Sequence, residues 1–123
     1  MDKEKSKTHV LLVEYDVFLA NIYEKKFELE GFKTSVADNG EKGLTEAKRK
    51  QPDIILLDNM RVGDVTKAVK LRKESKINVL LESSGGIHLH NVKAYARTGV
   101  DRISIGELTH SRQAIDFSLD IIR

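Results

Sequence analysis

Short apolar segments alternate with amphipathic segments along the chain. Five short runs are rich in β-branched and aliphatic side chains, as buried strands are. Each run is followed by a stretch in which apolar residues recur three or four positions apart, the spacing typical of a helix with one buried face. The pattern predicts strands at 10–13, 34–37, 54–57, 79–81 and 103–105, each followed by a helix.

The ends of several predicted helices carry capping signals. Apolar residues between Leu19 and Phe27 share one face of the first helix, and Gly31 follows as a C-cap. The fourth helix is expected to end at Gly99 in the same way, and the fifth to begin near Ser111. Five β-α units are therefore expected.

Strict alternation of short buried strands with helices implies right-handed crossovers and a parallel sheet covered on both faces. Five units are too few to close an eight-stranded barrel. The sequence therefore predicts an α/β fold of the flavodoxin-like type, a doubly wound five-stranded parallel sheet of order 2-1-3-4-5 in three α/β/α layers. Residues 1–123 are expected to form a single, monomeric domain.

The predicted core joins residues of the strands to the apolar faces of the helices. The strand residues expected in it are Val10, Leu12, Ile55, Leu57, Leu80 and Ile103, and the helix residues are Ile22, Phe27, Val69, Val92 and Ile115.

Composition narrows the class of protein. A hydrophobic content of 40% excludes a disordered chain. The charged first residues are followed by only a short apolar run, so no signal peptide is predicted and a cytoplasmic protein, produced by recombinant expression, is expected. The net charge of +2 comes from interspersed acidic and basic residues, which gives no support for nucleic-acid binding. We expect no membrane, nucleic-acid or protein partner.

Three carboxylates follow predicted strands: Glu14 and Asp16 come after the first strand, and Asp58 closes the third. The carboxyl ends of parallel strands meet at one edge of a sheet, where oxygen ligands could hold Mg²⁺. Alternatively, Glu14 and Asp16 cap the helix that begins near Val17. Both interpretations remain open from the residues alone.

The first half resembles a response-regulator receiver domain over about residues 8–60. The resemblance lies in the run THVLLVEYDVFLANIYEKKFELEGFKTSVADNGEKGLTEAKRKQPDIILLD. It implies that Glu14 and the next residue bind Mg²⁺ and that Asp58 accepts a phosphoryl group. However, Tyr15 stands where the family has its second acid, and Gly106 stands where it has a lysine. The resemblance therefore implies an incomplete phosphorelay.

The second half resembles the C-terminal segment of nicotinate-nucleotide pyrophosphorylase, or quinolinate phosphoribosyltransferase, over about residues 56–122. The motifs LLDNM, SGGI, TGVD, IS-IG and LTHS carry this resemblance. It implies the last strands of a TIM-type barrel, with a phosphate site at the positions of Ser84, Gly85, Gly86 and Gly106. Glycines allow backbone N–H groups to approach an anion closely, although an ordinary tight turn would also explain them.

The resemblance also implies that most of the transferase active site is missing, because it lies on earlier strands and on an N-terminal domain. No enzymatic activity and no required cofactor are therefore expected, and any binding of Mg²⁺ or phosphate should be weak. Glu107 would oppose an anion beside Gly106. His88 and His90 could begin a metal site, but no third ligand stands near them in the sequence.

Both families share an LLD run at the third strand, so we place the junction between a receiver-like half, 1–58, and a barrel-derived half, 59–123. The leading hypothesis is an engineered chimera, a designed protein that tests recombination between flavodoxin-like and TIM-barrel folds. One alternative is a receiver domain phosphorylated on Asp58. The other is a vestigial phosphate-binding module.

Overall fold

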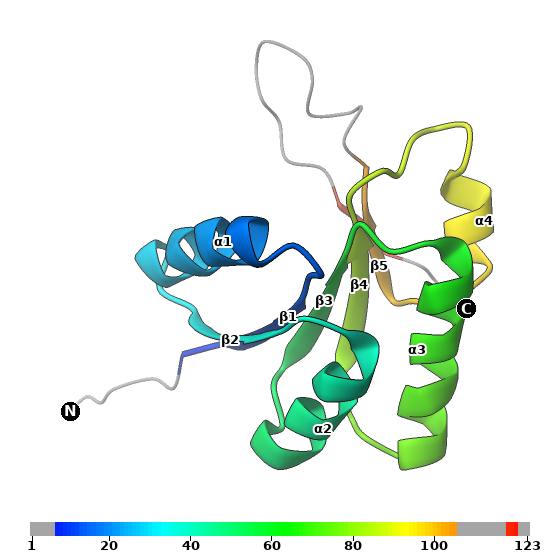
Figure 1. Ribbon diagram of the computed structural model, residues 1–123. Helices are drawn as coiled ribbons and strands as arrows, with labels where there is room; N and C mark the ends of the chain where they lie inside the picture. The colour runs from blue at the N-terminus through cyan, green and yellow to red at the C-terminus, as the bar shows by residue number, and fades with distance from the viewer. Residues whose placement is uncertain (1–6, 106–117, 121–123) are drawn as a thin grey trace, which may run out of the picture.

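The fold is an open sheet with helices on both faces (Figure 1). The computed structural model describes residues 7–105 and 118–120. Its elements, in chain order, are β1 His9–Val13, α1 Val17–Leu29, β2 Lys33–Ala37, α2 Gly40–Lys50, β3 Ile54–Asp58, α3 Val62–Ser75, β4 Leu80–Ser84, α4 Val92–Ala96, β5 Arg102–Ser104 and β6 Ser118–Asp120. Within these ranges no helix is both long and apolar enough to cross a membrane.

The strands are ordered β2-β1-β3-β4-β5-β6, and the first five run parallel. This confirms the predicted flavodoxin-like order 2-1-3-4-5. The register sets Val13 opposite Ala37 and Leu57, and Asp58 opposite Ser84. The strands β1, β3 and β4 therefore end at the same edge of the sheet, which is where α/β folds of this kind place their ligand sites.

The sixth strand corrects one expectation. Ser118–Asp120 were predicted within a fifth helix, but they form β6, antiparallel to β5, with Leu119 opposite Ile103. A short polar-apolar-polar run fits a strand as well as a helix face, and the hydrogen bonds of the β5 edge decide between them. The rest of the predicted helix, including Ile115, lies outside the described residues.

Side chains cap the first two helices as their sequences suggest. The carboxylate of Asp16 accepts hydrogen bonds from the backbone N–H groups of Phe18 and Leu19, which opens α1. The side-chain oxygen of Asn39 accepts one from the N–H of Lys42, which opens α2. Caps of this kind fix where each helix leaves the carboxyl edge of the sheet, and so they position the loops there.

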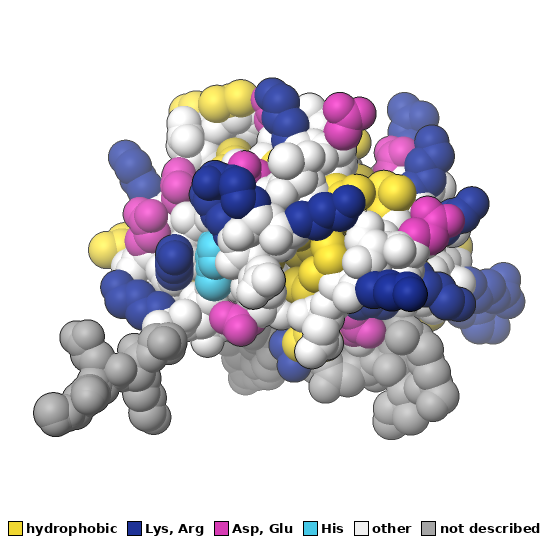
Figure 2. Space-filling model, turned by 90° about the horizontal axis from the view of Figure 1, so that it is seen from below, with side chains coloured by type: hydrophobic (Ala, Val, Ile, Leu, Met, Phe, Trp, Pro, Cys, Tyr) yellow, Lys and Arg dark blue, Asp and Glu magenta, His cyan; other side chains and the backbone are white. Residues whose placement is uncertain are grey.

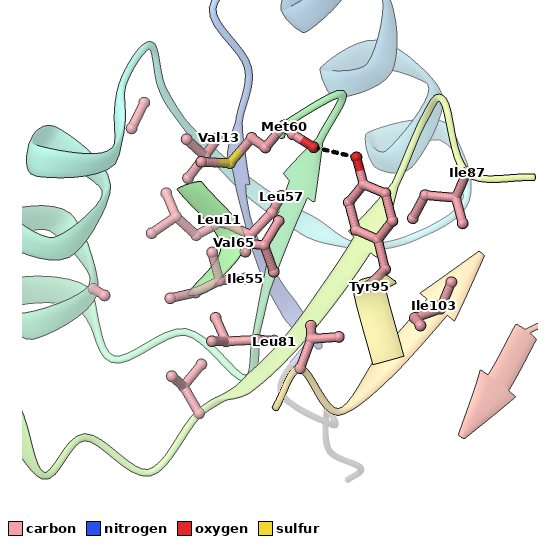
Figure 3. Close-up of a cluster of buried hydrophobic side chains, with 14 of the residues drawn as sticks. Leu11, Val13, Ile55, Leu57, Met60, Val65, Leu81, Ile87, Tyr95 and Ile103 are labelled. Atoms are coloured by element: carbon pink, nitrogen blue, oxygen red, sulfur yellow. Dashed lines mark hydrogen bonds between the residues drawn. The ribbon is translucent and has the colours of Figure 1, made fainter. Parts of the chain in front are cut away.

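The main core lies between the sheet and the helices α2, α3 and α4 (Figure 3). Alternate residues of the strands point into it, while Val65 and Tyr95 enter it from α3 and α4. The strand residues of this face are Leu11, Val13, Ile55, Leu57, Leu81 and Ile103.

The opposite face of the sheet carries α1, which packs over β1 and β2 (Figure 1). Val10 and Leu12 are buried there, as predicted. The prediction was wrong for Leu80 and Ile22, which remain 42% and 47% exposed. Strand β4 lies beyond the reach of α1, so an apolar residue of β4 on this face has no described helix above it.

A buried hydrogen bond ties α4 to the loop after β3. The hydroxyl of Tyr95 donates to the carbonyl oxygen of Met60 at 2.8 Å (Figure 3). We expect Tyr95→Phe to lower the free energy of unfolding by about 1–2 kcal/mol, because the carbonyl loses its partner in a place that water does not reach. Urea denaturation would measure this. The same change at the exposed Tyr15 should stay within about 0.5 kcal/mol, and equal losses at the two positions would contradict the role of the hydrogen bond.

Candidate functional site

Three polar side chains lie side by side at the carboxyl edge of the sheet, on the face that α1 covers. Glu14 follows β1, Asp58 ends β3 and Ser84 ends β4. The hydroxyl of Ser84 donates to Oδ1 of Asp58 at 3.0 Å. Both carboxyl groups belong to buried residues, with 3% of Glu14 and 7% of Asp58 exposed. The sequence-predicted candidates of the two halves thus meet at one place.

Asp58 stays protonated to a much higher pH than an ordinary aspartate does. The pKa of Asp58 is raised from 3.8 to about 7, first by burial and then by a hydrogen bond with Glu14 and the charge of Glu14, while the hydrogen bond from the Ser84 hydroxyl opposes the shift. Oε1 of Glu14 is buried and, among the described residues, has no other hydrogen-bond partner. A proton on Asp58 supplies the missing donor. At pH 7, which is about its pKa, Asp58 is protonated in about half of the molecules, so the pair carries on average fewer than two full charges.

A tyrosine of α1 faces this pair. The pKa of Tyr23 is raised, first by burial and then by the negative charges of Asp58 and Glu14. A phenol is an uncharged donor at neutral pH, so it can lie beside two carboxyls without adding charge. Nothing in the spacing of α1 distinguishes Tyr23 from Leu19 or Phe27, so the sequence alone does not mark it as a residue of the site.

Asp16 lies apart from the pair, because its carboxylate is engaged at the start of α1. Its backbone N–H donates to Oε2 of Glu14 at 3.0 Å, so the main chain of Asp16, and not its side chain, contacts the site. Residues 7–105 and 118–120 hold no cluster of three or more acidic or histidine side chains able to bind a metal. The structure thus brings together only Glu14 and Asp58 of the three predicted Mg²⁺ ligands.

The glycine loop after β4 packs directly on the end of β3. Gly85 and Gly86 both have positive φ, at +80° and +70°. A Cβ atom on Gly85 would lie 2.8 Å from Oδ1 of Asp58, so only glycine fits there. The N–H of Asn59, also at positive φ, donates to the carbonyl of Ser84 at 2.7 Å. Two of the four predicted phosphate-binding residues, Ser84 and Gly85, therefore adjoin the carboxyl group of Asp58, Gly86 lies near the side-chain amide of Asn59, and Gly106 lies outside the described residues.

Asn91 closes the same loop, and the sequence analysis missed it. Its side-chain oxygen accepts from the N–H of His88 at 2.7 Å, and its amide donates to the carbonyl of Gly86 at 3.0 Å. An asparagine just before the helical pattern at 92–96 is the signal that could have found it. The rings of His88 and His90 stack on each other with their centroids 5.2 Å apart.

Comparison with known protein families shows to which family the sequence belongs. Residues 22–120 match the family described as quinolinate phosphoribosyl transferase, C-terminal domain. The chain belongs to this family. The match begins within the half that resembles a receiver domain, earlier than the predicted residue 56, and both folds repeat β-α units of similar spacing.

Two relatives in this family illustrate the likeness. A probable carboxylating nicotinate-nucleotide pyrophosphorylase of Methanocaldococcus jannaschii is 41% identical over 86 residues, which cover 67% of this chain and 30% of that protein. The corresponding protein of Mycobacterium leprae is 48% identical over 71 residues, covering 58% of this chain and 25% of its own length. The chain thus spans no more than about a third of the relatives that it matches.

Solved structures with a similar fold include receiver domains of response regulators, which are not members of the transferase family. The receiver domain of the Francisella response regulator 1452 superposes with a TM-score of 0.70 at 23% identity, over 82% of this chain and 85% of that domain. At this identity the likeness concerns the fold alone. A quinolinate phosphoribosyl transferase sequence segment therefore occurs here in a sheet with the fold of a receiver domain.

Proposed function

We propose that this protein is an engineered chimera, in which a receiver-like half and a transferase-derived half form one scaffold without a complete active site of either parent. The observation that carries the proposal is the disagreement between sequence and fold. The sequence belongs to a transferase family, whereas the strand order 2-1-3-4-5 is that of a receiver domain. Recombination of the two at β3, where both parents have an LLD run, accounts for both findings.

The face of β4 and β5 that carries Ser84 supports this proposal. Arg102 lies opposite Glu82 in the register, and the hydroxyl of Ser104 donates to Oε2 of Glu82 at 2.7 Å. In a barrel, helices cover only the outer face of the strands, and the inner faces form the interior below the active site. In a doubly wound sheet both faces are covered and apolar. Glu82, Ser84 and Ser104 lie towards the carboxyl ends of β4 and β5, where the strands of a barrel carry their polar active-site residues, which supports a barrel origin for these strands.

Neither parental reaction has its full set of residues. A receiver site needs an ionised acid triad around Mg²⁺, but Tyr15 is exposed, Asp16 caps α1 and Asp58 holds a proton near neutral pH. The transferase half has only the phosphate-loop positions and Asp58. Binding and orienting two substrates would require the parts that this chain does not share with its relatives.

Acetyl phosphate tests the receiver alternative. Incubated with acetyl phosphate and Mg²⁺, the protein should keep its intact mass, because Tyr15 stands at the position of a receiver's second acid and Gly106 at the position of its lysine. An intact response-regulator receiver domain, treated in parallel, should gain one phosphoryl group. A mass increase of one phosphoryl group that disappears in Asp58→Asn would refute the proposal and establish phosphorylation of Asp58.

A further inference from the structure

A cavity of about 500 Å³ lies between α2 and α3, above the sheet. Its lining is mostly aliphatic and comes from both helices and from β1, β3 and β4. The residues that matter most here are Leu44, Ile55, Ala68, Leu71, Ile77 and Leu81. This volume is in the range of sites that bind small organic molecules.

The cavity has a simple cause. Helix α2 approaches the sheet closely through Gly43, where a Cβ atom would lie 2.9 Å from Cγ2 of Val13. On the facing side, α3 presents Ala68, another small residue. The small side chain of Ala68 leaves part of the space between the two helices unfilled. Leu71, which lines the same space, is 38% exposed, so the cavity is open to solvent along the groove between the helices.

Charged groups are unevenly placed along the cavity. Glu41 and Asp64 line it near the first turns of α2 and α3, whereas Lys67 and Arg72 line it further along α3. Arg72 is engaged with Asp101 and with the carbonyl of Val79. Lys67 is exposed and forms no ion pair with any residue that the structure describes. Viewed from the amino ends of the strands, apolar side chains lie between borders of Lys and Arg (Figure 2).

We propose that this cavity is a binding site for a small amphipathic anion, with its flat or aliphatic body between α2 and α3 and its acidic head group at Lys67. The apolar lining selects the body, and the cation selects the charge of the head group. The site is on the opposite face of the sheet from Glu14 and Asp58, so it is independent of the proposed function.

Titration with 2-naphthalenesulfonate, followed by backbone amide shifts, tests the site. We expect saturable shifts at Leu44, Ala68 and Leu71 with a dissociation constant on the order of 0.1–1 mM, the range for a ligand of this size. The uncharged 2-naphthalenemethanol should bind about threefold more weakly, since an exposed cation adds a modest attraction. Shifts confined to other parts of the protein, or none at millimolar ligand, would overturn the proposal.

Two variants with matched controls locate the ligand. Ala68→Leu fills the cavity and should weaken binding of both probes about tenfold or more, whereas Ala94→Leu, the same change at an exposed position of α4, should leave it within about twofold. Lys67→Gln should abolish the preference for the sulfonate, and Lys70→Gln, on the exposed part of α3, should keep it. If Ala68→Leu does not fold, the comparison of Lys67→Gln with Lys70→Gln still tests the proposed position of the head group. Equal effects of Lys67→Gln and Lys70→Gln would contradict the proposed site. Formation of a dimer when the sulfonate is added, detected by ultracentrifugation, would contradict it as well.

Discussion

Asp58→Asn will stabilise the protein at pH 8 by about 2 kcal/mol relative to the parent chain, and much less at pH 5. The pKa of Asp58 is about 7 in the folded protein, against an ordinary value of 3.8, so folding favours its protonated form. Such a group contributes stability that is complete below about pH 3.8 and is lost as the pH rises through 7. An asparagine amide supplies the donor to Glu14 at every pH, and so it removes this loss.

The variant must be compared with the parent chain at each pH, because the titration of His9 changes the stability with pH in the opposite direction to that of Asp58. Burial, together with Lys33 and Lys50, lowers the pKa of His9 in the folded state. The folded protein keeps His9 neutral, whereas the unfolded chain protonates it below its ordinary pKa of 6.5. The protein therefore loses stability as the pH falls below 6.5. This contribution is the same in both proteins, so the difference between their unfolding curves isolates Asp58.

Urea denaturation at pH 5, 6, 7 and 8 measures the effect. Glu74→Gln, an exposed charge removal on α3, serves as the control and should change the stability by less than about 0.5 kcal/mol at each pH. The account of a shared proton fails if Asp58→Asn is destabilising at pH 8, or if its effect does not depend on pH.

Truncating one core leucine in either half should destabilise the whole protein. Leu11 on β1 and Leu81 on β4 are each 1% exposed and lie in the same cluster. We expect Leu11→Ala and Leu81→Ala each to lower the free energy of unfolding by about 3 kcal/mol, from lost burial and the cavity that remains. Because residues before and after Asp58 share this cluster, both variants should still unfold in a single transition.

Each half offers its own control for this experiment. Leu29 in the first half and Leu89 in the second are 88% and 64% exposed, so the same truncation there should cost less than about 0.5 kcal/mol. Circular dichroism and amide signals from both halves would follow unfolding. Two separate transitions, one for each half, would show that the halves do not share a core.

Periodicity was sufficient to predict the sheet and four of the helices, because each β-α unit combines a short apolar run with a glycine or polar cap. It failed at Leu80, an apolar residue on a part of the face that no described helix covers, since strand sequence alone does not say which helix lies above it. It also failed at Ser118–Asp120, where pairing with a neighbouring edge decides the structure. Both failures concern contacts between elements, which local sequence does not encode.

For the site, the rule that parallel strands end at one edge predicted Glu14, Asp16 and Asp58 as neighbours, and the structure brings Glu14 and Asp58 together. Ser84 was predicted only as part of a phosphate loop, and its hydrogen bond to Asp58 was not foreseen. The proton shared by the two carboxyls depends on how deeply both are buried, which no motif reveals. The role of Asp16 was open between metal binding and capping, and only the direction of its side chain distinguishes these.

Asp58 lies at the proposed junction and contacts residues on both sides of it in the sequence, Glu14 before it and the Ser84 hydroxyl after it. Glu14 favours its neutral form, whereas Ser84 favours its charged form. A substitution at either position therefore changes the consequence of a substitution at the other, although they act through a third residue. In a mutational library of this protein, positions 14 and 84 should show epistasis, and either family alone would be a poor guide to which amino acids are acceptable there.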